Sequence, residues 1–136
     1  MSLIEQEIEY YLSPGRESVE TGAYEIATLA LNFSTNGDHD SAVEHYEKAI
    51  GLCHENGLRP MLCNFKIQAA KSLINLNRLE DASAYLEQAD TEVRAMENIR
   101  LMIDCSHTLA ICCRKKNEPE KAVEFYRNCI SIILEN

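Results

Sequence analysis

"SAVEHYEKAI", residues 41–50, decides how this sequence folds, because two similar segments follow it at a fixed distance. These segments are "DASAYLEQAD" at 81–90 and "KAVEFYRNCI" at 121–130, so the spacing is 40 residues with no insertion between copies. A constant period of this size is typical of repeat proteins, in which each unit packs on its neighbours. The sequence therefore predicts three copies of one structural unit.

Each copy has the pattern of two helices. In the quoted segments, apolar residues recur at spacing i, i+4, i+7 and i+11, which places them on one helical face. The aligned sets are Ala42, Ala82 and Ala122; Tyr46, Leu86 and Tyr126; Ala49, Ala89 and Cys129; and Cys53, Val93 and Ile133. A second stripe about a dozen residues upstream indicates a partner helix, through Leu29, Ala69 and Leu109; Ala30, Ala70 and Ala110; and Phe33, Leu73 and Cys113.

Turn-forming residues separate these helices. Gly37, Asn77 and Asn117 are residue types that tolerate the left-handed conformation at a helix C-terminus. Gly57 and Pro60 mark another boundary, whereas "AMENIR" at 95–100 has neither Gly nor Pro and predicts a softer junction. We predict helices at about 17–36, 38–56, 59–77, 79–96, 99–117 and 119–135. Residues 1–16 are predicted to hold a short helix, either a cap or the stump of a preceding repeat.

The composition indicates a globular domain. The chain has 136 residues, of which 46% are hydrophobic and 26% charged. Its net charge of −9 argues against nucleic-acid binding, and no apolar run is long enough to span a bilayer. We therefore expect a soluble, cytoplasmic protein. The six cysteines lie in helix-patterned segments, which predicts reduced, half-buried thiols and not a disulfide framework.

The pattern Leu-Ala-x-x-Phe followed by Ala-x-x-x-Tyr-x-x-Ala resembles the tetratricopeptide repeat. The first unit matches it best, with Leu29, Ala30, Phe33, Gly37, Ala42, Tyr46 and Ala49. The usual tryptophan is missing, and the period of 40 exceeds the family's 34, which predicts longer helices. The resemblance covers about residues 23–136. It implies an all-α fold, a right-handed α-solenoid of three helix hairpins at about 17–56, 57–96 and 97–136.

The resemblance also implies a protein-interaction scaffold that holds a peptide or protein segment on a concave wall made by the first helix of each pair. On this wall it places Tyr24, Thr28, Leu31, Asn64, Ile67, Gln68, Lys71, His107, Thr108, Ile111 and Arg114, with Ala27, Ser34, Ile74 and Asp104 beside them. The carboxylate clamp of co-chaperone members is not matched, because the corresponding residues carry no positive charge. Two alternatives stay open: a regulatory or sensory domain that binds a small signalling peptide or ligand, and a self-association domain.

The last helix has more apolar residues than one buried stripe requires. We predict self-association, as a homodimer, through Val123, Tyr126, Ile130, Ile133 and Leu134. A further segment downstream that covers this face is the other interpretation.

No catalytic motif is present: the sequence has no phosphate loop, nucleophile elbow or HExxH. Asp38-His39-Asp40 resembles a metal-ligand run, but its place at a helix start predicts capping. Helical geometry gives Cys105, His107, Cys112 and Cys113 no shared point for zinc. We predict no enzyme activity, no cofactor and no metal.

Overall fold

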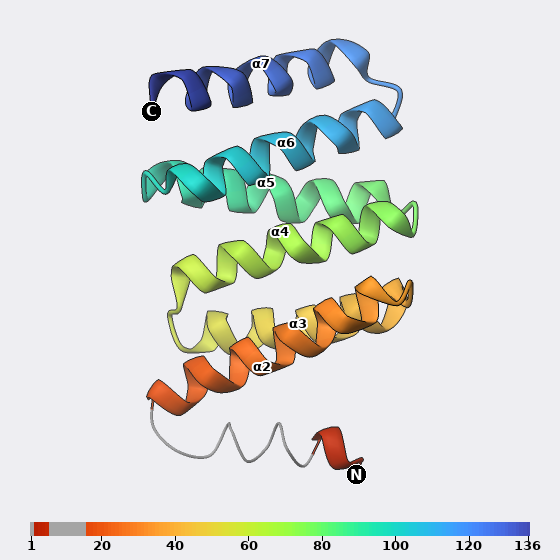
Figure 1. The fold of residues 1–136 in the computed structure, drawn as a ribbon, viewed down its shortest axis with the longest axis vertical. Coiled ribbons are helices and arrows are strands. Elements are labelled where there is room, and N and C mark those ends of the chain that lie inside the picture. Colours follow the sequence, from red (N-terminus) through yellow and green to blue (C-terminus); the bar gives the residue numbers. More distant parts are fainter. Residues whose placement is uncertain (1, 6–15) are drawn as a thin grey trace. The chain divides into compact units, whose positions relative to one another are not determined.

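The computed structural model of the chain describes residues 2–5 and 16–136, and every regular element in these residues is helical. Figure 1 shows the six long helices, α2 (Arg16–Thr35), α3 (His39–Glu55), α4 (Arg59–Asn75), α5 (Leu79–Ala95), α6 (Ile99–Lys115) and α7 (Pro119–Glu135). Residues 3–5 add one helical turn, and most of the helix predicted in 1–16 lies outside the described residues. The predicted all-α helical-repeat solenoid class is confirmed, while its right-handed sense stays a prediction.

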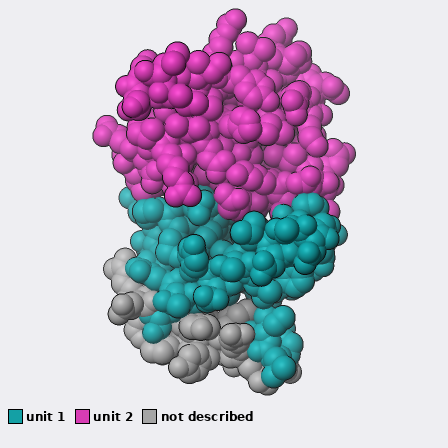
Figure 2. Space-filling model, in the orientation of Figure 1, with its two compact units in different colours: residues 1–65 teal, residues 66–136 magenta. Residues whose placement is uncertain are grey.

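The chain divides into two compact units, residues 1–65 and 66–136 (Figure 2). The first contains α2, α3 and the beginning of α4. The second contains the rest of α4 with α5, α6 and α7. Helices α2 and α3 pack together as a hairpin in the first unit, and α6 packs on both α5 and α7 in the second. The predicted repeat boundaries at 56/57 and 96/97 stay a prediction.

All five connectors between these helices have the same geometry. Each has three residues, and the second has a positive φ: 84° at Gly37, 66° at Gly57, 60° at Asn77, 53° at Glu97 and 62° at Asn117. At the first connector Gly37 N–H donates to Ser34 O and Asp38 N–H to Phe33 O, and the same pair of bonds recurs at the other four. These bonds define the Schellman motif, which satisfies the last carbonyls of a helix.

The repeated connector sets helix length. Each helix from α3 to α7 has 17 residues, and left-handed residues follow one another every 20 positions. The backbone conformation therefore has a period of 20 residues, half the 40-residue period of the sequence. The sequence period is longer because the two helices of a pair differ in their side-chain pattern. The predicted helix ends lie within two residues of the observed ones. Helices α4 and α6 end before their predicted ends because Asn77 and Asn117 are left-handed.

The junction at 95–100 differs from our expectation. It was predicted to be soft, yet Glu97 takes the same left-handed conformation as the glycines and asparagines. Asn98 Oδ1 then accepts from Leu101 N at 3.2 Å, which caps α6. The connector is thus as well defined as the others, although its left-handed residue is of a type that rarely adopts this conformation.

The helix starts confirm the predicted capping. Asp38 Oδ1 accepts from Ser41 N at 3.2 Å at the start of α3, and Pro119 occupies the first turn of α7. Asp40, Glu80 and Glu120 lie in the first turns of α3, α5 and α7, where negative charge meets the positive end of the helix dipole.

Small side chains fill the contacts between helices. In the first unit Ala30, Ala42 and Ala49 have no exposed surface, and in the second the same holds for Ala82 and Ala89 of α5 and for Ala110 of α6. Such residues let neighbouring backbones approach closely. The residues of the predicted stripes are buried, apart from Leu29, Phe33 and Tyr126, which are half-buried, and Ile133, which is exposed.

Replacing Glu97 by Gly will stabilise the protein by about 1 kcal/mol, because Gly adopts a left-handed conformation without the steric cost borne by other residues. Urea denaturation followed by far-UV circular dichroism measures the change. Glu87→Gly, in the interior of α5, is the matched control and will destabilise by about 1 kcal/mol. A Glu97→Gly midpoint equal to or below that of the unsubstituted protein would contradict the left-handed conformation at this position.

Candidate functional site

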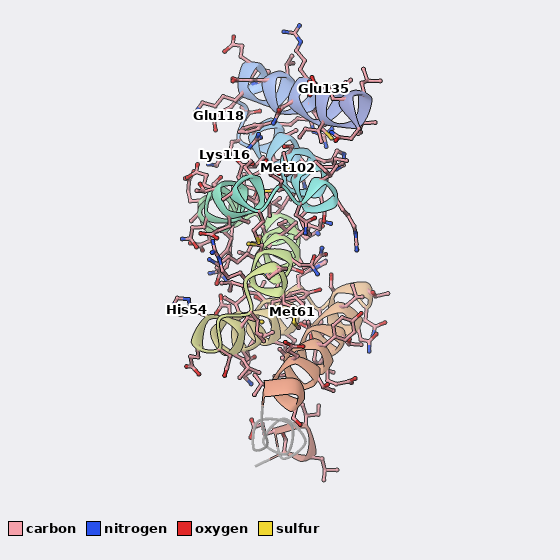
Figure 3. All side chains as sticks on the ribbon, turned by 90° about the vertical axis from the view of Figure 1, so that its left-hand side faces the viewer. His54, Met61, Met102, Lys116, Glu118 and Glu135 are labelled. Atoms are coloured by element: carbon pink, nitrogen blue, oxygen red, sulfur yellow. The ribbon has the colours of Figure 1, made fainter. Side chains whose placement is uncertain are left out.

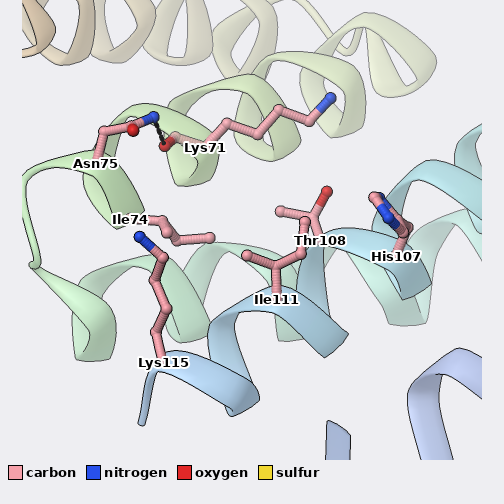
Figure 4. Close-up of a pocket in the computed structure, with 7 residues that line it drawn as sticks. All are labelled: Lys71, Ile74, Asn75, His107, Thr108, Ile111 and Lys115. Carbon is pink, nitrogen blue, oxygen red and sulfur yellow. Dashed lines mark hydrogen bonds between the residues drawn. The ribbon is translucent and has the colours of Figure 1, made fainter. Parts of the chain in front are cut away.

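A groove between α4 and α6 is the candidate site in the second unit. Its volume is about 350 Å³, it is open to solvent on one side, and it is lined by Lys71, Ile74, Asn75, His107, Thr108, Ile111 and Lys115 (Figure 4). Four of the predicted binding residues meet here: Lys71, His107, Thr108 and Ile111. Asn75 and Lys115 were not predicted, although Lys115 follows Ile111 by four residues, a spacing that keeps two side chains on one helical face.

An ion pair ties α4 to α6 beside this groove. Lys71 Nζ lies 2.9 Å from Asp104 Oδ1, and Gln68 Nε2 donates to Asp104 Oδ2 at 3.4 Å. Lys71 and Asp104 are both partly exposed, so water and salt screen their attraction. Within the part of the chain that the structure describes, Lys115 forms no ion pair, and its charge is therefore available to a ligand.

Apolar side chains form the floor of the groove. Ile74 is buried and Ile111 half-buried, and the Thr108 hydroxyl donates to Asp104 O at 2.7 Å, so it is already satisfied. Figure 4 shows Lys115 extending from α6 towards Ile74, Lys71 running along α4 above Thr108, and His107 beyond Thr108 on α6. The groove thus combines an apolar floor with positive charge at its rim.

The ring of His107 also contacts α7. It lies against Tyr126 in an edge-on arrangement, with ring centroids 6.0 Å apart. His107 is exposed and Tyr126 half-buried, so the contact joins the groove to the last helix at the surface of the second unit.

In the first unit, α2 carries three predicted binding residues on one exposed face. Tyr24 is 63% exposed and Leu31 52%, and Thr28 lies between them. The Thr28 hydroxyl donates to Tyr24 O at 2.9 Å, and Thr35 does the same to Leu31 O. These bonds turn the hydroxyl groups towards the helix and leave the methyl groups outward.

One predicted wall residue needs correction. Ile67 has no exposed surface, so this side chain belongs to the core and offers nothing that a peptide could contact. Thr108 is also buried, with only 1% exposed, although it lines the groove. Asn64 and Gln68 are half-buried, and Arg114 is exposed outside the groove lining. A binding role for the predicted wall residues stays a prediction.

Helix α7 exposes four of the five residues predicted for self-association. Val123 is 46% exposed, Ile130 and Ile133 are each 54% exposed, and Leu134 is 79% exposed. The opposite face holds Ala122, Cys129 and Ile132, which are buried. Figure 3 shows Lys116 and Glu118 together at the connector before α7 and Glu135 at the far end of this helix. Association of copies through this face stays a prediction.

All six cysteines are free and buried. Cys105 Sγ donates to Leu86 O and Cys112 Sγ to Leu79 O, both on α5, while His107 faces solvent. In the described residues no group of three or more His, Cys, Asp or Glu side chains could hold a metal ion. Burial raises the pKa of the Cys53 thiol to about 11, and burial together with the neighbouring Glu118 raises the pKa of Cys113.

The Asp38-His39-Asp40 segment serves the helix start. Hydrogen bonds from Ser41 lower the pKa of the Asp38 carboxyl, which keeps this cap ionised. Of the helices described, none has both the length and the apolar character needed to cross a membrane.

Comparison with known proteins identifies related repeats and folds. The tetratricopeptide repeat model matches residues 26–56 and 103–136. BtubC (BKLC) from P. vanneervenii is similar in structure, with a TM-score of 0.85, 17% identity, and coverage of 98% of this chain and 54% of that chain. The TPR domain of Arabidopsis FLU gives a TM-score of 0.80 at 14% identity, covering 87% of this chain and 99% of that one. At these identities the likeness concerns the fold. No curated protein matches this sequence.

Cys53 will react slowly with thiol reagents in the folded protein. With a pKa raised from 9.0 to about 11, its thiolate fraction at pH 8 is about a hundredfold lower than that of an ordinary cysteine. Mass spectrometry after iodoacetamide treatment measures the labelling of each cysteine. We expect all six to label in urea and Cys53 to remain unlabelled without it. Labelling of Cys53 at equal rates in both conditions would contradict its burial.

Proposed function

Because this chain belongs to the tetratricopeptide-repeat family, whose members generally mediate protein–protein interactions, we propose that it binds a segment of a partner protein in the groove between α4 and α6. One observation carries this proposal: an apolar floor and a cationic rim occur in the same open groove. A groove of this kind suits an extended or helical segment that continues beyond it at both ends.

The lining indicates the chemistry of the partner. Ile74 and Ile111 can accept an apolar side chain, and Lys115 can pair with a neighbouring carboxylate. Lys71 is held by Asp104, and a carboxylate of the partner can compete with Asp104 for its ammonium group. We therefore propose a partner segment in which Leu, Ile or a similar residue lies beside Asp or Glu.

The distribution of charge supports an acidic partner at this unit. Residues 66–136 contain 10 Lys and Arg against 11 Asp and Glu, so they are nearly neutral. Residues 1–65 contain three bases and 11 acids. An acidic segment is therefore repelled much less by the second unit than it would be by the first.

The small-ligand alternative has less support. Sites for small molecules bury most of the ligand, usually in cavities of roughly 300 to 1,000 Å³. This groove is near the lower limit and open on one side. The six free cysteines support the accompanying proposal that the protein works in a reducing compartment such as the cytoplasm.

Two peptide pools, one with Leu or Ile flanked by Asp and Glu and one with the same apolar residues flanked by Lys and Arg, test the proposed function. We expect the acidic pool to bind the full chain and Lys115→Glu to weaken that binding about tenfold, as fluorescence anisotropy will show. Removing one favourable charge pair and adding a repulsive one accounts for a change of this size.

Arg100→Glu is the matched control, because it makes the same change of charge in the first turn of α6, outside the groove lining. We expect it to leave binding within about twofold of the unsubstituted protein, since exposed charges far from a ligand are screened. Equal binding of the two pools, or equal losses for the two substitutions, would contradict a specific acidic partner in this groove.

A further inference from the structure

Helix α7 exposes positions that the preceding helices bury. Its residues Val123, Tyr126 and Ile133 occupy the positions of Val43, Tyr46 and Cys53 in α3, which are 4%, 3% and 0% exposed. In α5 the counterparts of Tyr126 and Ile133 are Leu86 and Val93, and both are fully buried. On α7, in contrast, Val123 is 46% exposed and Ile133 54%. Helix α7 therefore has the surface of an interior repeat helix, and no element of the described residues covers Val123 or Ile133.

The neighbour of α5 shows what kind of element covers such a face. Cys105 Sγ of α6 donates to Leu86 O at 3.4 Å, and Cys112 Sγ donates to Leu79 O at 3.6 Å. The two donors are seven residues apart on α6, and their acceptors are seven residues apart in the opposite direction, so the helices are antiparallel. Small side chains at these two positions let the backbones approach closely.

Two more contacts complete this interface. Cys112 Sγ lies 3.4 Å from Ser83 Oγ, and Lys116 Nζ pairs with Glu80 Oε2 at 3.3 Å. The helix that covers α5 therefore has a small residue, a second small residue seven positions later, and a cation four positions after that.

The same features are present on α7, 40 residues further along the chain. Glu120 corresponds to Glu80, and Val123 corresponds to Ser83. The two acceptor carbonyls, those of Leu79 and Leu86 on α5, correspond to the carbonyls of Pro119 and Tyr126 on α7. We propose that the exposed face of α7 binds one antiparallel helix of a partner protein with the spacing just described. Because Val123 is larger than Ser83, the second small residue of the partner is Ala or Gly in place of Cys.

Neither α2 nor α7 of a second copy, the first and last long helices of the described residues, supplies such a helix. If copies stacked end to end, α2 would take the role of α6, and Glu25 and Asn32 would stand where Cys105 and Cys112 stand. Burying an unpaired carboxylate there is unfavourable. If two α7 helices paired antiparallel along their full length, their midpoints would bring two Arg127 side chains together, which like-charge repulsion opposes.

This surface differs in its lining residues from the groove between α4 and α6, to which the His107–Tyr126 contact links it, and it can be tested with a fragment of the chain itself. The probe is a fluorescein-labelled peptide of residues 98–116 that carries Cys105→Ala, Cys112→Ala and Cys113→Ser. We expect saturable binding to the full chain, measured by anisotropy, and a loss of at least tenfold with Ile133→Asp. Ile130→Asp will give a similar loss. Both positions are exposed, so the folded state tolerates these changes, and circular dichroism will verify this.

Matched controls separate docking on α7 from other modes of binding. Glu124→Gln changes an exposed residue of α7 beside the apolar face and will leave binding within about twofold. A peptide with Cys105→Leu and Cys112→Leu will bind at least tenfold more weakly, because large side chains keep the helices apart.

Three results would overturn the proposal. The first is the absence of saturable binding. The second is binding that ignores both α7 substitutions, which would mean that the peptide replaces α6 on α5. The third is a dimeric mass in light scattering that becomes monomeric with Ile133→Asp, which would assign the face to a second copy.

Discussion

One left-handed residue at each connector is the constraint on which the rest of the structure depends. An α-helix turns about 100° per residue, so a single extra residue would rotate every later side chain away from its neighbour. The left-handed residues at 37, 57, 77, 97 and 117 end each helix at the same point and keep the helices from α3 to α7 at 17 residues. Small residues such as Ala82 and Ala110 therefore stay buried in the helix contacts.

The same requirement for close approach explains why a chain with no disulfide contains six cysteines. A thiol is little larger than an alanine methyl group, and it can donate a weak hydrogen bond when it is buried. Cys105 and Cys112 donate to carbonyls of α5, and Cys129 donates to Ile103 O of α6 at 3.7 Å. Packing and these hydrogen bonds account for the three cysteines.

Most of the fold could be predicted from the sequence, because three copies aligned without gaps reveal both helices of each pair. The left-handed conformation of Glu97 could not be predicted, because glutamate is not a residue type that favours this conformation. For the candidate site, helical periodicity predicted that Lys71 and His107 share a surface, and both residues line the groove. It gave no measure of how far neighbouring helices cover a side chain, which is why Ile67 was misassigned. The groove itself depends on distances across helices, such as that between Lys71 and Asp104, which one sequence does not contain.

Two threonines of α2, Thr28 and Thr35, make the exposed surface of this helix more apolar. Thr28 and Thr35 carry polar hydroxyl groups, but each hydroxyl donates its hydrogen to a helix carbonyl, that of Tyr24 or of Leu31. Water that wets this strip of helix therefore meets mainly methyl groups, an aromatic ring and a leucine side chain. This surface of α2 is therefore more apolar than its residue types indicate, and the water that covers it is easier to displace.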